Sequence, residues 1–199
     1  MIELSPPFSD ETIGSLHMGD MVYLSGKIYT ARDAAHKKLA ELIEEGKTPP
    51  FEFDGQAVFY TGPSPAKSGR PIGSVGPTTA GRMDRYSPLL ISKGLKVMIG
   101  KGPRKKEVID AIVKHRGLYF AATGGIAALM AKCVKSAKVI AFDDLGTEAV
   151  RELIVEKLPV VVAIDSGGNN LYESGRAEYC VKTMVQSTAI KEKKRDTQA

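Results

Sequence analysis

Short apolar runs rich in β-branched residues alternate with amphipathic helical patterns, and this alternation constrains the fold more than any other feature of the chain. The runs predict strands over residues 21–24, 57–60, 96–99, 118–122, 139–142 and 160–164. The patterns between them predict helices over residues 31–45, 83–93, 104–114, 126–134 and 147–157. This order is typical of the α/β class, in which helices flank a sheet.

The boundaries of two helices can be predicted from single residues. The helix over 31–45 has Thr30 and Asp33 at the spacing of a capping box and Gly46 directly after its last residue. The helix over 147–157 is expected to stop before Pro159, because proline cannot continue a helical hydrogen-bond ladder.

The chain is expected to contain one domain and a C-terminal extension. Its 199 residues suffice for one core, and residues 1–172 are predicted to form a single domain followed by an extension over 173–199 with a partly disordered tail. Residues 62–71 contain too much proline and glycine for a regular element and should form an ordered loop or a mobile flap. Since no targeting pattern or membrane-length apolar run occurs, a soluble cytoplasmic protein is expected.

Charge and cysteine content narrow the classes of function. The 28 Lys and Arg against 23 Asp and Glu give a net charge of +5, with the two signs interspersed. A solvated mixed surface is therefore favoured over a nucleic-acid interface, although the basic cluster over 191–196 leaves a binding arm open. Cys133 and Cys180 are too few to form a zinc site or to hold an iron–sulfur cluster, so any cluster must come from a partner.

A loop over residues 73–84 is the strongest candidate site, because it places small residues, two hydroxyl groups and a guanidinium just before a predicted helix. Thr78, Thr79 and Arg82 could surround an anion together with backbone N–H groups. Two glycines of the loop have P-loop spacing, but an arginine and a methionine replace the required lysine and Ser/Thr, so a Walker nucleotide site is not expected. A tight turn that caps the helix is the alternative interpretation.

Two further segments carry cationic side chains. Lys101 lies between Gly100 and Gly102 after a predicted strand, where open α/β sheets bind ligands, although an exposed turn fits equally well. Arg32 and His36 lie one turn apart at the start of the first long helix and could face one pocket. A cation in the first turn opposes the helix dipole unless an anion is near, whereas a lone histidine is more often structural.

Together the three segments offer cations, hydroxyl groups and one histidine, without a carboxylate pair or a cluster of metal ligands. Guanidinium groups hold carboxylates in a bidentate fork, and binding one carboxylate of a ligand positions its remaining carbons. These residues therefore favour a small dicarboxylate as the ligand.

The same segments resemble the β subunit, or C-terminal domain, of class I fumarate hydratases and L-tartrate dehydratases, which are iron–sulfur-dependent hydro-lyases. The strings TARDAAH at 30–36 and GPTTAGRMD at 76–84 are the most specific, and the resemblance covers about residues 3–172. Shorter matches lie at 24–26, 60–63, 99–102, 124–125 and 146–149. The resemblance implies a swivelling β/β/α domain with mixed sheets flanked by helices.

The resemblance also implies reversible hydration of fumarate to L-malate at an active site shared with a separate α subunit. That α subunit would hold a four-iron four-sulfur cluster whose open iron binds the substrate, and this chain would bind no metal. The implied assembly contains two α and two β subunits, and the implied partners include neither nucleic acid nor a membrane.

Site residues follow from the same match. The catalytic threonine falls on Thr78, which would exchange the proton on the carbon next to a carboxylate and would need activation by neighbouring charge. His36 matches a histidine with an active-site role in the tartrate branch and is a second catalytic candidate. The positions that bind the substrate carboxylates and hydroxyl fall on Arg32, Thr79, Arg82 and Lys101.

Two alternatives stay open. Ala80 and Gly81 favour the fumarase branch, because tartrate dehydratases tend to have a serine and a methionine there; the β subunit of L-tartrate dehydratase, or of another 2-hydroxy-dicarboxylate hydro-lyase, is the alternative enzyme. A stand-alone module that binds small anions or nucleic acid is the alternative from another class. No function is assigned to the sequence beyond Glu173.

Overall fold

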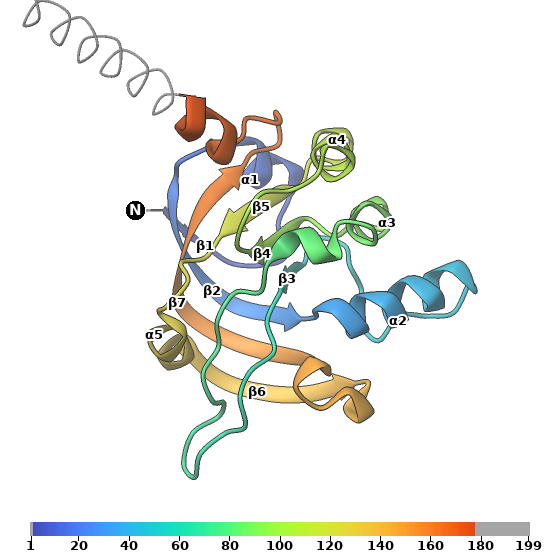
Figure 1. The fold of residues 1–199 in the computed structure, drawn as a ribbon, viewed down its shortest axis with the longest axis vertical. Helices are drawn as coiled ribbons and strands as arrows, with labels where there is room; N and C mark the ends of the chain where they lie inside the picture. Colours follow the sequence, from blue (N-terminus) through green and yellow to red (C-terminus); the bar gives the residue numbers. More distant parts are fainter. Residues whose placement is uncertain (1, 178–199) are drawn as a thin grey trace, which may run out of the picture.

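The computed structural model describes residues 2–177 and contains one seven-stranded mixed sheet flanked by helices (Figure 1). The strands are β1 (Ile2–Leu4), β2 (Met21–Thr30), β3 (Ala57–Phe59), β4 (Val97–Gly100), β5 (Leu118–Ala121), β6 (Val134–Ala141) and β7 (Val150–Ile164). The α-helices are α1 (Asp10–Gly14), α2 (Asp33–Glu44), α3 (Ser87–Ser92), α4 (Lys106–His115) and α5 (Ala127–Cys133). Two 3₁₀ helices, η1 (Ala80–Met83) and η2 (Asp143–Glu148), complete the fold, which confirms the predicted single-domain α/β class.

The pairing of β7 closes most of the sheet into a ring. Strands β2, β3, β4 and β5 pair in parallel, one after the other, and β7 then runs antiparallel both to β5 and to β2. The remaining two strands extend the ring, since β1 pairs with β2 and β6 pairs with β7. Because β2 to β5 are parallel, their carboxyl ends share one rim of this ring.

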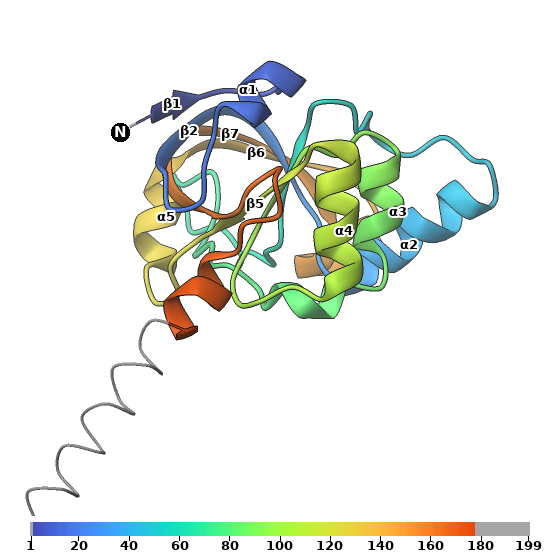
Figure 2. The ribbon, with the colours of Figure 1, turned by 90° about the horizontal axis from the view of Figure 1, so that it is seen from above.

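Alternate residues of the central strands face two separate cores. Phe59, Ile99 and Phe120 pack in the cluster within the ring, whereas their neighbours Val58 and Met98 pack in the cluster beneath the helices. Figure 2 shows α2, α3 and α4 together on one side of the strands and α5 on the other. The continuous apolar run of each short central strand is therefore explained by burial on both faces.

The predicted helix over 147–157 is wrong. Its first residues belong to η2, and the rest form the first half of the strand β7. Leu153 and Val155 are buried while Ile154 between them is exposed, which is strand periodicity, and both edges of β7 are paired. Pro159 therefore lies within the β2–β7 ladder, opposite Tyr23, instead of ending a helix.

The ends of α2 were predicted with mixed success. Gly46 confirms its predicted role, because it adopts a φ of +69° and the Lys47 N–H donates to the Leu42 carbonyl at 2.8 Å, as in a Schellman motif. The predicted capping box is wrong: Arg32 is the N-cap residue, without a capping side chain. The Thr30 hydroxyl instead accepts a hydrogen bond from the Arg151 N–H of β7 at 3.1 Å.

The other predicted helices and strands differ from the observed ones mainly in length. The predicted helix over 83–93 is divided between η1 and α3, and the predicted strand over 139–142 begins earlier, as β6. Strand β1 and helix α1 were not predicted. The predicted loop over 62–71 contains no helix or strand.

The predicted C-terminal extension is described only at its start. Residues 171–177 are helical, whereas 178–199, which include Cys180 and the basic cluster, lie outside the described residues. Within residues 2–177, no helix has both the length and the apolar character needed to cross a bilayer.

Candidate functional site

The segment around Thr78 is inserted between the carboxyl ends of β3 and β4. The Thr78 N–H donates to the Tyr60 carbonyl at 2.6 Å, and the Thr78 carbonyl accepts from the Lys101 N–H at 3.2 Å. The Ala80 N–H then donates to the Lys101 carbonyl at 2.8 Å, so that Thr79 and Lys101 pair as a parallel bridge. Backbone hydrogen bonds thus bring Thr78, Thr79 and Lys101 to one place on the rim.

Gly100 makes this close approach feasible. A Cβ atom at this position would lie 3.1 Å from both Ala80 Cβ and Tyr60 Cδ2, and 3.4 Å from the Thr78 carbonyl oxygen. A larger residue at position 100 would push the segment 78–80 away from β4. Thr78 is only 9% exposed, whereas Thr79 and Lys101 are exposed, so the candidate base lies deeper than its neighbours.

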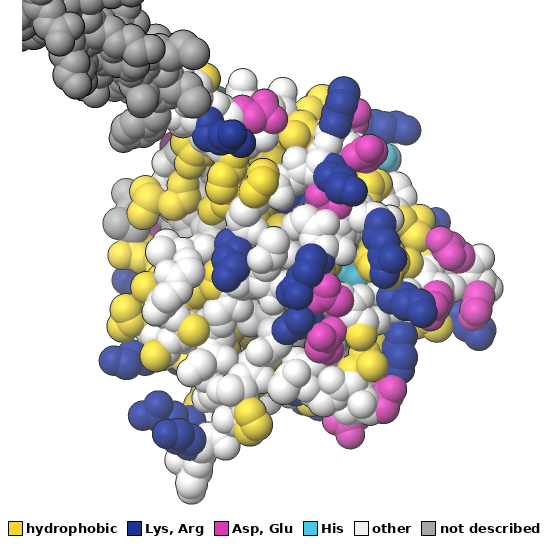
Figure 3. Space-filling model, viewed as in Figure 1, with side chains coloured by type: hydrophobic (Ala, Val, Ile, Leu, Met, Phe, Trp, Pro, Cys, Tyr) yellow, Lys and Arg dark blue, Asp and Glu magenta, His cyan; other side chains and the backbone are white. Residues whose placement is uncertain are grey.

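The two candidate arginines are joined by one carboxylate. Asp33 Oδ2 lies 3.1 Å from Arg32 Nε, and Asp33 Oδ1 lies 3.3 Å from Arg82 Nε. Figure 3 shows Lys, Arg, Asp and Glu side chains gathered over the start of α2. Since Arg82 belongs to η1, which begins directly after Thr79, the structure brings five of the six predicted site residues together along one rim.

A second carboxylate at this rim was not predicted. Glu148 of η2 accepts a hydrogen bond from the Ala34 N–H at 2.8 Å through Oε2, and its Oε1 lies 3.3 Å from Arg32 Nε. The anion expected near Arg32 at the N-terminus of α2 is therefore the Glu148 carboxylate of the same chain. Segment 146–149 is one of the shorter matches to the family, and this match was the signal that could have identified Glu148. The Glu148 carboxylate was given no role from the sequence alone.

His36 is the sixth predicted residue, and it lies beneath the rim. Its side chain is fully buried, with Nδ1 at 3.1 Å from the Arg32 carbonyl oxygen and the ring edge-to-face against Tyr60 at 4.9 Å between centroids. Its Nε2 has no hydrogen-bond partner among the described residues. Burial lowers the pKa of His36 to about 4, against the opposing effect of the Arg32 carbonyl, so the imidazole is neutral at pH 7.

The burial of His36 predicts a pH-dependent stability. Between about pH 6.5 and pH 4 the unfolded state binds a proton that the folded state does not, so the free energy of unfolding falls as the pH falls through this window. The expected loss between pH 7 and pH 4 is about 3 kcal/mol. Urea unfolding of the wild type and of His36→Gln at several pH values measures it; parallel pH profiles of the two proteins would contradict the prediction.

A buried ionic network supports the rim from below. Arg104 Nε donates to Asp84 Oδ1 at 2.7 Å, and Arg104 Nη2 donates to the Ser87 hydroxyl at 2.8 Å. The guanidinium also lies over the rings of Tyr60 and Tyr119, at 5.3 and 4.9 Å from their centroids. The network ties the end of η1 to α3, α4 and the strands. Sequence reasoning missed it, although Asp84 is the last residue of the string at 76–84.

The turn that carries Lys101 is held by two tyrosines. The Gly102 carbonyl accepts from the Tyr119 hydroxyl at 3.0 Å, and the Gly102 N–H donates to the Tyr172 hydroxyl at 3.0 Å. Gly102 has a φ of +84°, a conformation that glycine adopts without strain. Tyr172 therefore connects the helical segment that begins at Leu171 to the candidate site.

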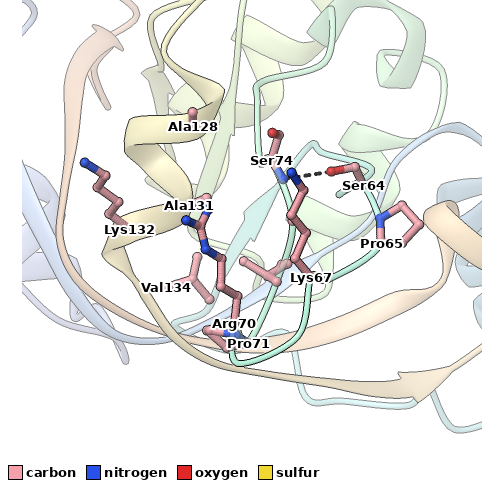
Figure 4. Close-up of a pocket in the computed structure, with 12 residues that line it drawn as sticks. Ser64, Pro65, Lys67, Arg70, Pro71, Ser74, Ala128, Ala131, Lys132 and Val134 are labelled. Atoms are coloured by element: carbon pink, nitrogen blue, oxygen red, sulfur yellow. Dashed lines mark hydrogen bonds between the residues drawn. The ribbon is translucent and has the colours of Figure 1, made fainter.

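A cavity of about 550 Å³ lies apart from these residues, between the 64–74 loop and α5. Figure 4 shows Lys67 and Arg70 on the loop and Lys132 on α5 around this space, with the loop closed by a hydrogen bond from the Ser74 N–H to the Ser64 hydroxyl. None of the six predicted site residues lines the cavity.

The residues of this chain do not fit an iron–sulfur cluster. The whole sequence contains two cysteines, fewer than the thiolates that such clusters require. Cys133 lies on α5, and burial raises the pKa of its thiol. Among the described residues, no three His, Cys, Asp or Glu side chains are grouped as metal ligands.

Comparison with known proteins identifies a family and several similar proteins. The Fumarase C-terminus family model matches residues 1–175. The chain is 42% identical over 152 residues to the anaerobic class I fumarate hydratase of Escherichia coli, which covers 75% of this chain and 28% of that protein. It is 41% identical over 157 residues to fumarate hydratase 2 of Leishmania major, covering 78% of this chain and 28% of that protein.

A shorter relative matches over most of its length. The chain is 40% identical over 167 residues to the putative L(+)-tartrate dehydratase subunit beta of Methanocaldococcus jannaschii, covering 81% of this chain and 86% of that protein. The chain thus spans less than a third of the two fumarate hydratases but nearly the whole of the tartrate dehydratase subunit.

Proposed function

Because the chain belongs to the fumarase C-terminus family, we propose that it is the β subunit of a two-subunit class I fumarate hydratase, which reversibly hydrates fumarate to L-malate. The observation that carries the proposal is the placement of Thr78, Lys101, Arg32 and Arg82 around one rim. Two guanidinium groups and an ammonium beside a mostly buried hydroxyl suit a ligand with two carboxylates and a reacting carbon between them.

The metal cluster of the proposed active site would belong to another chain. An α subunit would hold the four-iron four-sulfur cluster, which supplies a Lewis acid when bound, and two copies of each subunit would form the assembly. The β chain would act as a swivelling domain over residues 1–172, closing its rim on that subunit. A cytoplasmic location stays a prediction.

The residues of this chain have distinct roles in the proposed reaction. Arg32 and Arg82 bind the substrate carboxylates, with Thr79 and Lys101 completing the polar contacts. In the dehydration direction, Thr78 Oγ1, deprotonated beforehand to its alkoxide, takes the proton from the carbon next to a carboxylate and becomes a hydroxyl, while the C–O bond of the neighbouring carbon breaks and hydroxide leaves. During hydration the hydroxyl returns the proton. An unperturbed threonine is a weak base, so the cations on the rim must stabilise the negative charge that develops on the substrate. His36 is the second catalytic candidate of this proposal, and its Nδ1 lies 3.1 Å from the Arg32 carbonyl oxygen.

The test is anaerobic co-expression with a cluster-bearing α-subunit candidate, followed by ultraviolet assays of fumarate and of tartrate. Fumarate turnover by the complex, absent from either chain alone, supports the proposal. The absence of any complex would contradict it and would favour the stand-alone module that binds anions or nucleic acid.

The β subunit of L-tartrate dehydratase is the second candidate. The relative from Methanocaldococcus jannaschii favours it, because the match covers 86% of that protein, which is named a putative L(+)-tartrate dehydratase subunit beta. Turnover of tartrate without turnover of fumarate in the same assay would move the chain to this branch.

Replacing Arg82 by Lys is expected to weaken dicarboxylate binding. An ammonium group cannot reproduce the bidentate fork, and the contact between Arg82 Nε and Asp33 Oδ1 is lost as well. The expected result is a KM for fumarate raised about tenfold. Steady-state kinetics of the complex measures it, with Arg85→Lys on the adjoining exposed surface as the control. An unchanged KM would remove Arg82 from the substrate-binding residues.

A further inference from the structure

We propose that Asp33 and Glu148 are positioning residues, which hold the two candidate substrate-binding arginines through Nε and thereby present their terminal nitrogens to a dicarboxylate. The inference rests on the proposed function and deepens it, because neither carboxylate has a role in that proposal. Both residues act through an arginine and do not contact the substrate.

The contacts of the arginines show how the presentation works. Each contact between a carboxylate and a guanidinium is at Nε: Arg32 Nε donates to Asp33 Oδ2 at 3.1 Å, Arg82 Nε lies 3.3 Å from Asp33 Oδ1, and Arg32 Nε lies 3.3 Å from Glu148 Oε1. The guanidinium is planar, with its five N–H groups in a fixed fork. Contacts at Nε therefore set the direction of the Nη1 and Nη2 pair, which is the pair that forms an end-on fork with a ligand carboxylate.

Asp33 also opposes repulsion between the two cations. Its two oxygens contact different arginines, at 3.1 and 3.3 Å, so that one negative charge bridges two positive ones. Arg82 is 49% exposed, and a long exposed side chain has many accessible rotamers. The Asp33 bridge reduces the number of rotamers that Arg82 populates before the ligand binds. The entropic cost of ligand binding is therefore lower.

Glu148 can position Arg32 because it is itself held in place. Its second oxygen is fixed by the Ala34 N–H at 2.8 Å. The 3₁₀ helix that carries it is fixed by the Arg151 guanidinium, which donates to the carbonyls of Gly146, Thr147 and Ala149 at 2.7 to 3.1 Å. The orientation of Arg32 thus depends on an element more than 100 residues away in the sequence.

Gly62 leaves the space for this arrangement. A Cβ atom there would lie 3.1 Å from Arg32 Nη1 and 3.3 Å from the Thr147 carbonyl oxygen. The side chain of Arg32 therefore passes beside the β3 end and the residue before Glu148, which limits where its guanidinium can point.

Two simpler roles for Glu148 predict different results. If it only caps α2, its loss changes stability and leaves the kinetics of the folded enzyme unaltered. If it only reduces the positive charge of the rim, its neutralisation tightens the binding of a dianion and lowers KM. Positioning predicts the opposite sign, a higher KM with little change in kcat, because the fork is no longer pre-oriented.

The variant that tests the proposal is Glu148→Gln in the reconstituted complex. We expect KM for fumarate to rise about tenfold while kcat changes by less than about threefold. In the double variant with Arg32→Lys, KM should stay within about twofold of Arg32→Lys alone, since both changes remove the same contact. The matched control is Glu152→Gln, whose partially exposed carboxylate lies 3.9 Å from Lys27 Nζ.

A second measurement does not depend on catalysis, and its first part uses only the wild-type chain. In the wild-type chain alone, the Nε–H proton of Arg32, which donates to Asp33 Oδ2 at 3.1 Å, should exchange slowly with water in NMR spectra, and succinate should shift the Nε–H signals of Arg32 and Arg82. Glu148→Gln should accelerate exchange at Arg32 but not at Arg82, whereas Asp33→Asn should affect both.

The outcomes separate the two proposals. A wild-type complex without hydro-lyase activity would overturn the proposed function, whereas an active complex in which Glu148→Gln behaves like Glu152→Gln would overturn the positioning role alone. A lowered KM in Glu148→Gln, or rapid exchange at the Arg32 Nε–H in the wild type, would also overturn it.

Discussion

Thr78→Ala in the reconstituted complex is expected to lower kcat by about three orders of magnitude, with a smaller change in KM. The Thr78 side chain is mostly buried at the rim, and its backbone is fixed by hydrogen bonds to Tyr60 and Lys101. Alanine accepts the same backbone conformation, so the substitution removes the hydroxyl without moving the segment. The proton on the reacting carbon then lacks its acceptor.

Two measurements and two further variants make the Thr78 result specific. Steady-state kinetics of the complex gives kcat and KM, and thermal unfolding of each variant shows whether the fold is retained. Thr78→Ser keeps the hydroxyl and should retain much more activity than Thr78→Ala, while Thr48→Ala, in an exposed loop, should match the wild type. Activity of Thr78→Ala within about threefold of the wild type would remove Thr78 from the catalytic residues.

Arg104→Met is expected to lower the free energy of unfolding by about 4 kcal/mol, because it leaves the carboxylate of Asp84 buried without its cation. The two side chains are almost completely buried and form a hydrogen bond of 2.7 Å, and Arg104 also packs between two tyrosine rings. The Lys105 N–H, at 2.8 Å from Asp84 Oδ2, is a neutral donor and cannot replace the lost charge.

Urea unfolding at pH 7 measures this loss. Lys106→Met is the matched control, because it breaks an exposed ion pair with Asp110 in the adjoining helix and should change stability by less than about 0.5 kcal/mol. Adding Asp84→Asn to Arg104→Met should restore part of the stability, since no unpaired charge remains. Equal stability of Arg104→Met and Lys106→Met would show that the buried pair contributes little.

The sequence was sufficient for features that depend on neighbours along the chain. The apolar runs of the central strands, the apolar period of α2 and the role of Gly46 as the C-terminal stop of α2 were predictable because they follow local geometry. The chemically distinctive strings at 30–36 and 76–84 likewise identified the family and the candidate residues. Covalent connection already places Thr78, Thr79 and Arg82 within one short segment.

The tertiary structure decided what depends on pairing between distant segments. Residues 150–157 contain good helix formers, yet they form a strand because β2 and β6 offer hydrogen bonds on both edges and a core for alternate side chains. The same long-range closure brings Glu148 to Arg32 and buries His36 and Arg104. Local sequence determines propensity and the available chemical groups, whereas burial and charge pairing arise only when separate segments meet, and they decide how the rim can act.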